Sequence, residues 1–169
     1  GYSSAASDVY KRQVENYRRL TRIPAPIRTQ ISIAELFTDL KKLFPEEEFQ
    51  FEVPSPELKL NVDRTQIEQI LINLLKNARE ACSRKSDKKI QVKARKLSAG
   101  NTTLTISDNG EGILPDVLDK IFVPFFTTKT SGSGIGLSLC KQIMTLHEGS
   151  INVKSEVGKG SSFILTFPK

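Results

Sequence analysis

Residues 63–81 read DRTQIEQILINLLKNAREA, and this stretch decides which fold the chain adopts. Apolar residues recur in it every three or four positions, at Ile67, Ile70, Leu71, Leu74, Leu75, Ala78 and Ala81. This is the spacing of the buried face of an α-helix. Asp63 precedes the stripe and Gln66 follows three positions later, which is the pattern of a capped helix start. The stretch therefore predicts a long amphipathic helix.

Asn73 and Asn77 lie one helical turn apart within this stretch, so their side chains share a face. At about 100° per residue they fall beside the apolar stripe, at the edge of the core. A carboxamide oxygen is a ligand for Mg²⁺, which usually takes one or two protein oxygens together with phosphate oxygens and water. Taken alone, such a pair is more often a solvated part of a helix surface.

The flanking segments predict the other elements of one domain. A helix is expected from Ser32, with Glu35 completing a capping box, to the position before Pro45, and a buried helix at about 135–146. Strands are expected at 49–53, 58–62, 89–96, 103–107, 151–154 and 162–167. Residues 108–133 are expected to form a long functional loop. Three helices with five or six strands favour a two-layer α/β sandwich, with the helices on one face of a mixed sheet.

Length and composition suit one globular domain of 169 residues, with 38% hydrophobic and 26% charged residues. The net charge of +6 favours anionic partners without singling out nucleic acid. Two cysteines exclude a disulfide framework, and one histidine excludes a histidine-rich metal site. Neither a membrane-spanning run nor a signal peptide is recognisable. We expect a cytoplasmic fragment without membrane contact.

The chain is expected to consist of an N-terminal tail with a linker and one folded domain. Residues 1–30 are small, polar and then basic, and Pro24 and Pro26 disfavour helix in the residues before them. We interpret this part as a tail with a helical portion, followed by an extended linker. Residues 31–169 would form the folded domain.

Two glycine-containing segments carry further signals. DNGEGI (108–113) ends a predicted strand with a carboxylate and turns tightly afterwards, although Asp-Asn-Gly is also an ordinary turn. GSGIGL (132–137) precedes the second buried helix, where glycines and the helix N-terminus favour phosphate. It follows a long loop rather than a first strand, which excludes a dinucleotide fold. No Lys-Ser or Lys-Thr closes it, which excludes a P-loop.

Together these segments resemble the ATP-binding domain of sensor histidine kinases, within the Bergerat-fold (GHKL) superfamily of gyrase-type topoisomerases, mismatch-repair ATPases and a heat-shock chaperone. NLLKNA (73–78) is similar to the family's N box, and residues 108–113 and 132–137 to its two glycine boxes. FVPFFTTK (122–129) is similar to the F box in its nitrogen-regulation form, and GKGSSF (158–163) to the final glycine turn. The resemblance implies the Bergerat fold from residue 31 onward.

The resemblance also implies a role for individual residues. Asn77 would coordinate Mg²⁺, and Asp108 would accept from the adenine amino group, supported by the hydroxyl of Ser161. Asn73 and Lys129 would be catalytic, and residues 114–131 would form a mobile lid. The resemblance implies that ATP contacts Asn73, Lys76, Asn77, Asp108, Gly110, Gly112, Ile113, Thr128, Lys129, Gly132, Ser133, Gly134, Ile135, Gly136, Leu137 and Ser161.

One departure from the hydrolytic relatives indicates the reaction class. Those ATPases carry a water-activating Glu where this chain has Asn73, and a carboxamide does not accept a proton near neutral pH. Phosphoryl transfer needs mainly positioning and charge neutralisation. The sequence thus predicts slow hydrolysis and transfer to a histidine of a separate dimerisation domain, with a response regulator downstream. The alternatives are a hydrolytic Bergerat ATPase and a nucleotide-binding scaffold of the anti-sigma type.

Other chemistry-bearing residues are interpreted as structural or as contact sites. His147 ends the second buried helix directly before Gly149, whereas a phosphoacceptor needs an exposed helical site, so we expect a structural role. The basic residues around Lys93 lack interleaved aromatics, and no nucleic-acid partner is expected. Phe122, Phe125 and Phe126 are expected to dock the lid or a partner helix. Cys82 and Cys140 are expected to be buried or inert.

Overall fold

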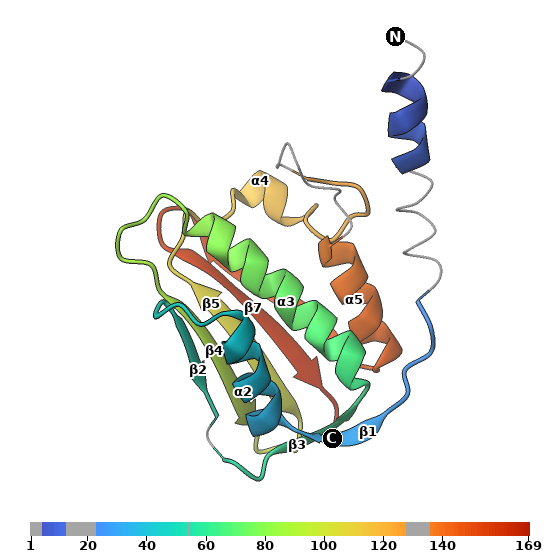
Figure 1. The fold of residues 1–169 in the computed structure, drawn as a ribbon, viewed down its shortest axis with the longest axis vertical. Coiled ribbons are helices and arrows are strands. Elements are labelled where there is room, and N and C mark those ends of the chain that lie inside the picture. The colour runs from blue at the N-terminus through green and yellow to red at the C-terminus, as the bar shows by residue number, and fades with distance from the viewer. Residues whose placement is uncertain (1–4, 13–22, 54, 128–135) are drawn as a thin grey trace.

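A mixed β-sheet covered by helices makes up the structure, a computed structural model that describes residues 5–12, 23–53, 55–127 and 136–169. Its labelled elements are β1 (Thr29–Ser32), α2 (Ile33–Leu43), β2 (Phe49–Glu52), β3 (Lys59–Val62), α3 (Arg64–Ala81), β4 (Ile90–Lys96), β5 (Thr102–Asp108), α4 (Pro115–Leu118), α5 (Gly136–Leu146), β6 (Ser150–Glu156) and β7 (Gly160–Phe167). Residues 5–12 form a further helical segment that projects away from the sheet (Figure 1).

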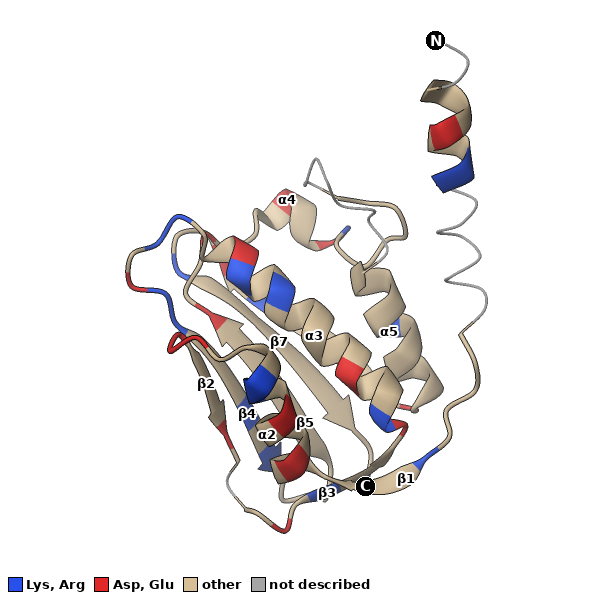
Figure 2. Cartoon of the chain, in the orientation of Figure 1, with Lys and Arg blue, Asp and Glu red and all other residues tan. Residues whose placement is uncertain are grey.

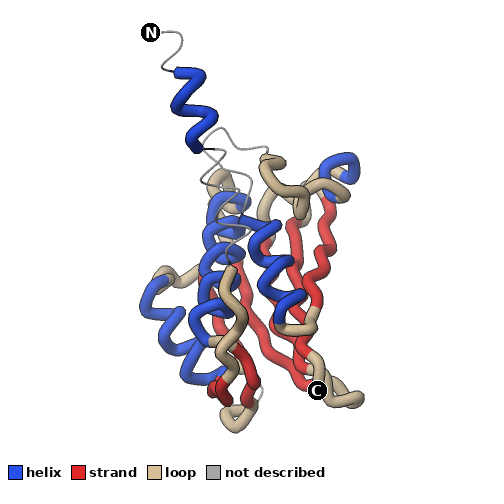
Figure 3. Tube along the Cα trace, turned by 90° about the vertical axis from the view of Figure 1, so that its right-hand side faces the viewer, coloured by secondary structure: helices blue, strands red, loops and turns tan. Residues whose placement is uncertain are grey.

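The sheet has the strand order β2-β4-β5-β7-β6. Strand β2 runs parallel to β4, and every other neighbouring pair is antiparallel. Helices α2, α3 and α5 cover one face, so that helices and strands form two layers (Figures 1 and 3). Strands β1 and β3 pair with each other in a separate two-stranded ribbon. The predicted two-layer sandwich with a mixed sheet is confirmed.

Helix α3 lies at the centre of the helical layer, as its apolar stripe predicts. The side chain of Asp63 accepts from the backbone N–H of Gln66, which is the expected cap. Residues 67, 70, 71, 74, 75 and 78 are all buried. Each fully buried Leu or Ile contributes about 1.5–3 kcal/mol relative to an exposed one. Ala81, the last member of the predicted stripe, is only half-buried.

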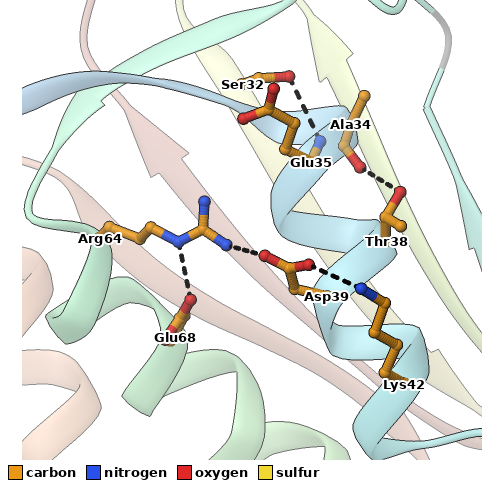
Figure 4. Close-up of polar contacts among 8 residues, drawn as sticks. All are labelled: Ser32, Ala34, Glu35, Thr38, Asp39, Lys42, Arg64 and Glu68. Carbon is orange, nitrogen blue, oxygen red and sulfur yellow. Dashed lines mark hydrogen bonds and ion pairs between the residues drawn. The ribbon is translucent and has the colours of Figure 1, made fainter.

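Polar side chains connect α2 with the start of α3 (Figure 4). The Ser32 hydroxyl accepts from the backbone N–H of Glu35 at 3.3 Å, which confirms the predicted cap of α2. Arg64 donates to Glu68 at 2.9 Å and also to Asp39, which in turn faces Lys42 at 3.6 Å. These charges are partly exposed, so the network orients the helices and adds little stability.

Charge is distributed unevenly over the two layers. Basic residues gather on the connection between α3 and β4 and on β4 itself, whereas α5 is almost uncharged (Figure 2). Helix α5 packs on α3 and β6, with Ser138, Leu139, Cys140, Ile143 and Met144 buried. Within the described residues, no helix is long and apolar enough to cross a membrane.

Three local features differ from the sequence expectations or go beyond them. Pairing begins at Thr29, which lies opposite Val62 in the β1–β3 ribbon, so the expected linker is partly strand. The two strands around Pro54 are not neighbours, since β2 joins the main sheet and β3 joins β1. The loop after residue 108 contains the short helix α4, which begins at Pro115, a residue preorganised for the first position of a helix.

The end of α5 has a backbone conformation that favours glycine but holds Glu148, whose φ is 60°. The N–H of Gly149 donates to the carbonyl of Met144 at 2.9 Å, and that of Glu148 to Thr145 at 2.9 Å. These bonds close the helix in the way that usually places glycine in the left-handed position. Glu148 therefore carries avoidable backbone strain.

We predict that Glu148→Gly stabilises the protein. Relief of the left-handed strain outweighs the extra freedom of glycine in the unfolded chain, for a net gain of about 0.5–1 kcal/mol. Chemical denaturation measures this gain. Thr145→Gly, a change inside the helix, is the matched control and should lose about 1 kcal/mol. A loss of stability in Glu148→Gly would contradict the assignment of strain.

Candidate functional site

The two asparagines of α3 meet the start of α5. Asn77 Nδ2 donates to Asn73 Oδ1 at 3.4 Å, and both side chains are half-buried. A first side-chain carbon built on Gly136 would lie only 2.6 Å from Asn73 Nδ2. The last glycine of the 132–137 segment therefore lets α5 approach the carboxamide pair. Two motifs far apart in the sequence come together here.

Asp108 supplies a desolvated carboxylate at the end of β5. Burial raises the pKa of its carboxyl, while the backbone N–H groups of Gly110 and Ser161 act in the opposite direction. The N–H of Gly110 donates to Asp108 Oδ1 at 2.9 Å. The side chain is thus a strong acceptor held in fixed orientation, which suits a donor edge such as an amino group of a heterocyclic base.

The loop after Asp108 rests on the end of the helix that carries the asparagines. The N–H of Glu111 donates to the carbonyl of Ala81 at 3.1 Å. A side-chain carbon on Gly110 would lie 2.4 Å from that same carbonyl oxygen, so only glycine permits this contact. The short loop therefore fixes the distance between Asp108 and α3.

The same loop is also bound to the turn between β6 and β7. Gly112 has a φ of 77°, and the N–H of Gly158 donates to the carbonyl of Glu111 at 2.9 Å. The N–H of Ile113 donates to the hydroxyl of Ser155 at 2.8 Å. Gly112 and Ile113, both predicted to shape a base pocket, thus lie in a segment anchored on two sides.

Ser161 lies opposite Asp108 in the β5–β7 pair, but its hydroxyl is engaged elsewhere. Ser155 Oγ donates to the carbonyl of Gly160 at 3.1 Å and lies 2.8 Å from Ser161 Oγ. A hydroxyl has one hydrogen, so Ser161 is the donor of that second bond. Support for Asp108 therefore comes from the backbone N–H of Ser161, whereas the family resemblance implied support from the hydroxyl.

Asn109 has a structural role that the sequence analysis did not identify. Its Oδ1 accepts from the N–H of Lys89 at 2.9 Å, and its Nδ2 donates to the carbonyl of Asp87 at 2.8 Å. The side chain thereby holds the α3–β4 connection beside the site. Asparagine is common in turns for this kind of bond, but the partner segment is not evident from local sequence.

The two cysteines are buried, as predicted. Burial raises the pKa of the Cys82 thiol, and the negative charge of Asp108 raises it further. Burial raises the pKa of the Cys140 thiol to about 12. Both side chains are therefore neutral thiols near neutral pH, and neither acts as a nucleophile.

Part of the predicted site lies outside the described residues. These positions are Thr128, Lys129, Gly132, Ser133, Gly134 and Ile135. Lys76 is exposed on α3, and Leu137 is half-buried at the start of α5. Phe122 is half-buried with Lys141 Nζ 5.7 Å from its ring centre, whereas Phe125 is 41% exposed with a φ of 68°. The docking role of these phenylalanines remains a prediction.

The side chains of the candidate site could bind a divalent metal ion only if a bound polyphosphate supplied further oxygen ligands. Within the described ranges there is no group of three His, Cys, Asp or Glu side chains that would hold a metal ion. A carboxamide such as that of Asn77 supplies one neutral oxygen, and Mg²⁺ completes its shell with phosphate oxygens and water. The site is therefore suited to a metal that arrives with a polyphosphate.

His147 is a buried structural residue, as predicted, with only 2% of its surface exposed. Its Nδ1 lies 2.9 Å from the carbonyl of Ile143, and its Nε2 accepts from the N–H of Asp63 at 3.1 Å. Nδ1 therefore carries the proton, and both ring nitrogens have partners. The ring joins the end of α5 to the start of α3.

Comparison with known proteins finds a family match and similar proteins that are histidine kinases. Residues 62–169 match the family of histidine kinase-, DNA gyrase B-, and HSP90-like ATPases. Sensor histidine kinase ZraS of Salmonella typhimurium (strain LT2) is 39% identical over 110 residues, 65% of this chain and 23% of that protein. The histidine-protein kinase AtoS of Escherichia coli (strain K12) is 42% identical over 109 residues, 64% of this chain and 18% of that protein. The chain spans less than a quarter of these relatives.

Solved structures agree with the sequence relatives. The catalytic domain of histidine kinase ThkA has a TM-score of 0.74 and 35% identity, over 84% of this chain and 95% of that one. Histidine kinase ThkA in complex with the response regulator protein TrrA has a TM-score of 0.75 and 27% identity. That match covers 98% of this chain and 49% of the other.

We predict that Asp108→Asn changes the pH dependence of stability. In the folded state the pKa of the Asp108 carboxyl is raised above its ordinary value of 3.8. The neutral form that predominates below pH 3.8 is therefore compatible with burial, and the stability that this gives is lost as pH rises through the folded pKa and the carboxyl ionises. The stability of Asp108→Asn relative to the parent should thus be greater at pH 7 than at pH 4. Denaturation at both pH values measures this, with the exposed Asp116→Asn as control. An equal difference at both values would contradict the desolvation.

We also predict that Gly136→Ala weakens ATP binding while leaving the stability of the fold nearly unchanged. The new methyl group displaces the end of the Asn73 side chain, which turns away with little cost to folding. ATP affinity should fall at least about tenfold because the carboxamide pair is no longer preorganised. Gly110→Ala, which meets the Ala81 backbone instead, should cost about 1–3 kcal/mol of stability. Calorimetry and denaturation check both variants, and unchanged affinity in Gly136→Ala would exclude Asn73 from the site.

Proposed function

Because the chain belongs to the family of histidine kinase-, DNA gyrase B-, and HSP90-like ATPases, which implies ATP binding, we propose that it is the catalytic domain of a sensor histidine kinase. It would transfer the γ-phosphoryl group of Mg-ATP to a histidine on a separate dimerisation domain. The identity of ZraS, AtoS and the ThkA catalytic domain as histidine kinases supports this choice within the family.

The observation that carries the proposal is the environment of Asn73. Its carboxamide contacts Asn77 and lies against Gly136, at the position where the hydrolytic relatives would place a general base. A carboxamide orients a phosphate or a water through hydrogen bonds but does not remove a proton near neutral pH. A site of this kind favours transfer to an acceptor that is already nucleophilic, such as a neutral imidazole nitrogen.

The base of ATP would be recognised at the end of β5. Asp108 would accept from the adenine amino group, and its fixed Oδ1 and desolvated environment make that hydrogen bond selective for a donor. Gly110, Gly112 and Ile113 would form the wall beside the base, because their segment is anchored on Ala81 and Ser155. The backbone bonds of this segment preorganise the pocket.

The phosphates would lie between α3 and α5. Asn77 would hold Mg²⁺, which neutralises phosphate charge when bound. Asn73 and Lys76 would face the phosphates from α3, and Gly136 with Leu137 from the start of α5. We assign Thr128, Lys129, Gly132, Ser133, Gly134 and Ile135 to the same phosphate site from the sequence alone. Ser161 would complete the base pocket. The similarity of this chain to histidine kinases of the nitrogen-regulation type remains a prediction.

The partners of the domain follow from the proposed reaction. The helical segment 5–12 projects from the domain with Val9 and Tyr10 exposed, which suits the end of a dimerisation helix (Figures 1 and 3). We also propose that residues 1–30 form a tail and linker and that residues 31–169 form the ATP-binding domain. A response regulator would act downstream, and ThkA, a structural neighbour, is known in complex with one. We place the domain in the cytoplasm, without nucleic-acid or membrane contact.

We predict phosphoryl transfer by the chain to a helical hairpin that carries the acceptor histidine. With labelled Mg-ATP the hairpin should become labelled, and Asn77→Ala should lower the rate about a hundredfold through loss of metal positioning. Asn152→Ala, a change of an exposed asparagine on β6, is the matched control. Label on the hairpin at an unchanged rate in Asn77→Ala would contradict the site assignment.

Hydrolysis separates the proposed kinase from an ATPase or a scaffold. The unaltered chain should release phosphate slowly without the hairpin, and Asn73→Asp should release it faster because a carboxylate accepts a proton from water. Rapid release by the unaltered chain would favour the hydrolytic ATPase. Nucleotide binding without labelling of any hairpin would favour the scaffold.

A further inference from the structure

Residues 23–28, called the strap below, lie across the ends of two helices. In Figure 1 this segment passes beside α5 on its way to β1. Ile23 packs against the core, and Pro24 and Pro26 hold the backbone in extended conformations. The entropy lost when the strap docks is therefore small for its length.

The strap is bound to the start of α3 by two side chains of that helix end. The N–H of Ile27 donates to Asp63 Oδ2 at 2.9 Å, and Gln66 Nε2 donates to the carbonyl of Pro24 at 2.8 Å. Asp63 Oδ1 meanwhile caps α3 through Gln66. The N–H of Ile27 is the main cause of a lowered pKa at Asp63, so the carboxylate is charged and shared between helix and strap.

The strap is bound to the end of α5 by an arginine. Arg28 Nη2 donates to the carbonyl of Leu146 at 3.1 Å, one of the carbonyls that the helix leaves without an internal partner. Arg28 also lies 4.0 Å from the carboxylate of Glu148. Since His147 joins Asp63 to α5 directly, the strap, α3 and α5 form one connected set of contacts.

The opposite ends of the same two helices form the candidate site. Asn73 and Asn77 lie toward the end of α3, and Gly136 begins α5 against Asn73. A packed helix moves as a rigid body, so a shift of α5 at the strap changes the contact at Gly136. The strap is therefore placed to act on the site without touching a ligand.

Docking of the strap leaves one polar atom without a partner. Gln66 is 6% exposed, and within the described residues its Oε1 has no hydrogen-bond partner. A buried acceptor of this kind costs free energy that an undocked strap would return by admitting water. The hydrogen bond from Gln66 to Pro24 therefore comes with a buried acceptor that has no partner in the described part of the chain, which limits how strongly the strap is held.

We propose that docking of the strap fixes α5 on α3 and thereby sets the affinity of the site for nucleotide. The inference rests on the proposed function, because it names the regulation of that same site. The segment that enters the domain from the helical residues 5–12 would then control nucleotide binding through helix position. A linker that merely tethers the domain would leave the affinity unchanged.

The test compares strap variants with matched controls in the full chain. Arg28→Ala removes the donor to Leu146, Gln66→Glu removes the donor to Pro24 while keeping an acceptor, and Arg28→Lys restores a donor to Leu146. Gln69→Glu is the control on the exposed side of α3, and Val92→Ala lowers stability in β4 without touching the strap. Calorimetry with AMPPNP and Mg²⁺ measures affinity, and hydrogen exchange measures the amide of Ile27.

We expect Arg28→Ala and Gln66→Glu to weaken AMPPNP binding about fivefold, at the low end of typical coupling between sites. Arg28→Lys should regain most of the affinity, and both controls should keep it. By reciprocity, AMPPNP should slow exchange at Ile27 by a similar factor. If Arg28→Ala exchanges the Ile27 amide faster but binds AMPPNP with unchanged affinity, the inference is overturned and the proposed function still stands. Failure of the unaltered chain to bind AMPPNP would overturn the proposed function as well.

Discussion

The close approach of α5 to α3, made possible by the missing side chain of Gly136, is the constraint on which the site depends. It places the Asn73 carboxamide at the junction of the two helices. The remaining parts are built around α3. Its buried stripe fixes it on the sheet, and its last carbonyl supports the loop after Asp108. One helix therefore positions the carboxamide pair, the carboxylate loop and Gly136 relative to one another.

The site is organised at some cost to stability. Asp108 is kept partly desolvated, which raises its pKa, although a neutral residue there would fold more easily at neutral pH. Phe125 adopts a positive φ angle that non-glycine residues avoid. Strain and desolvation of this kind are common at functional sites, where the rest of the fold compensates for them. Here the compensation comes from the buried core beneath α3.

The sequence predicted the elements whose signals are local. The stripe after Asp63 and the caps at Ser32 and Asp63 depend on residues three or four positions apart, and the structure confirms them. The glycine segments predict a common site as a set, and the structure places Gly110 against Ala81 and Gly136 against Asn73, both on α3. The family assignment from these motifs is confirmed as well. Short-range patterns therefore carried most of the fold and the outline of the site.

The features that the sequence did not predict depend on long-range partners. Strands β2 and β3 have similar local patterns, and only packing decides that β2 joins β4 while β3 joins β1. The Ser155–Ser161 bond and the contacts of Asn109 with Asp87 and Lys89 likewise join segments whose proximity is not encoded locally. The strap contacts have the same origin, since nothing in the proline pattern reveals Gln66 or Leu146 as partners.

A crystal structure with an ATP analogue, and with manganese in place of magnesium, would show whether Asn77 holds the metal, because anomalous scattering locates the ion. We expect a single manganese ion bound to Oδ1 of Asn77 and to phosphate oxygens, with the adenine amino group donating to Asp108. A nucleotide bound elsewhere, or a metal ion that has no contact with Asn77, would contradict it.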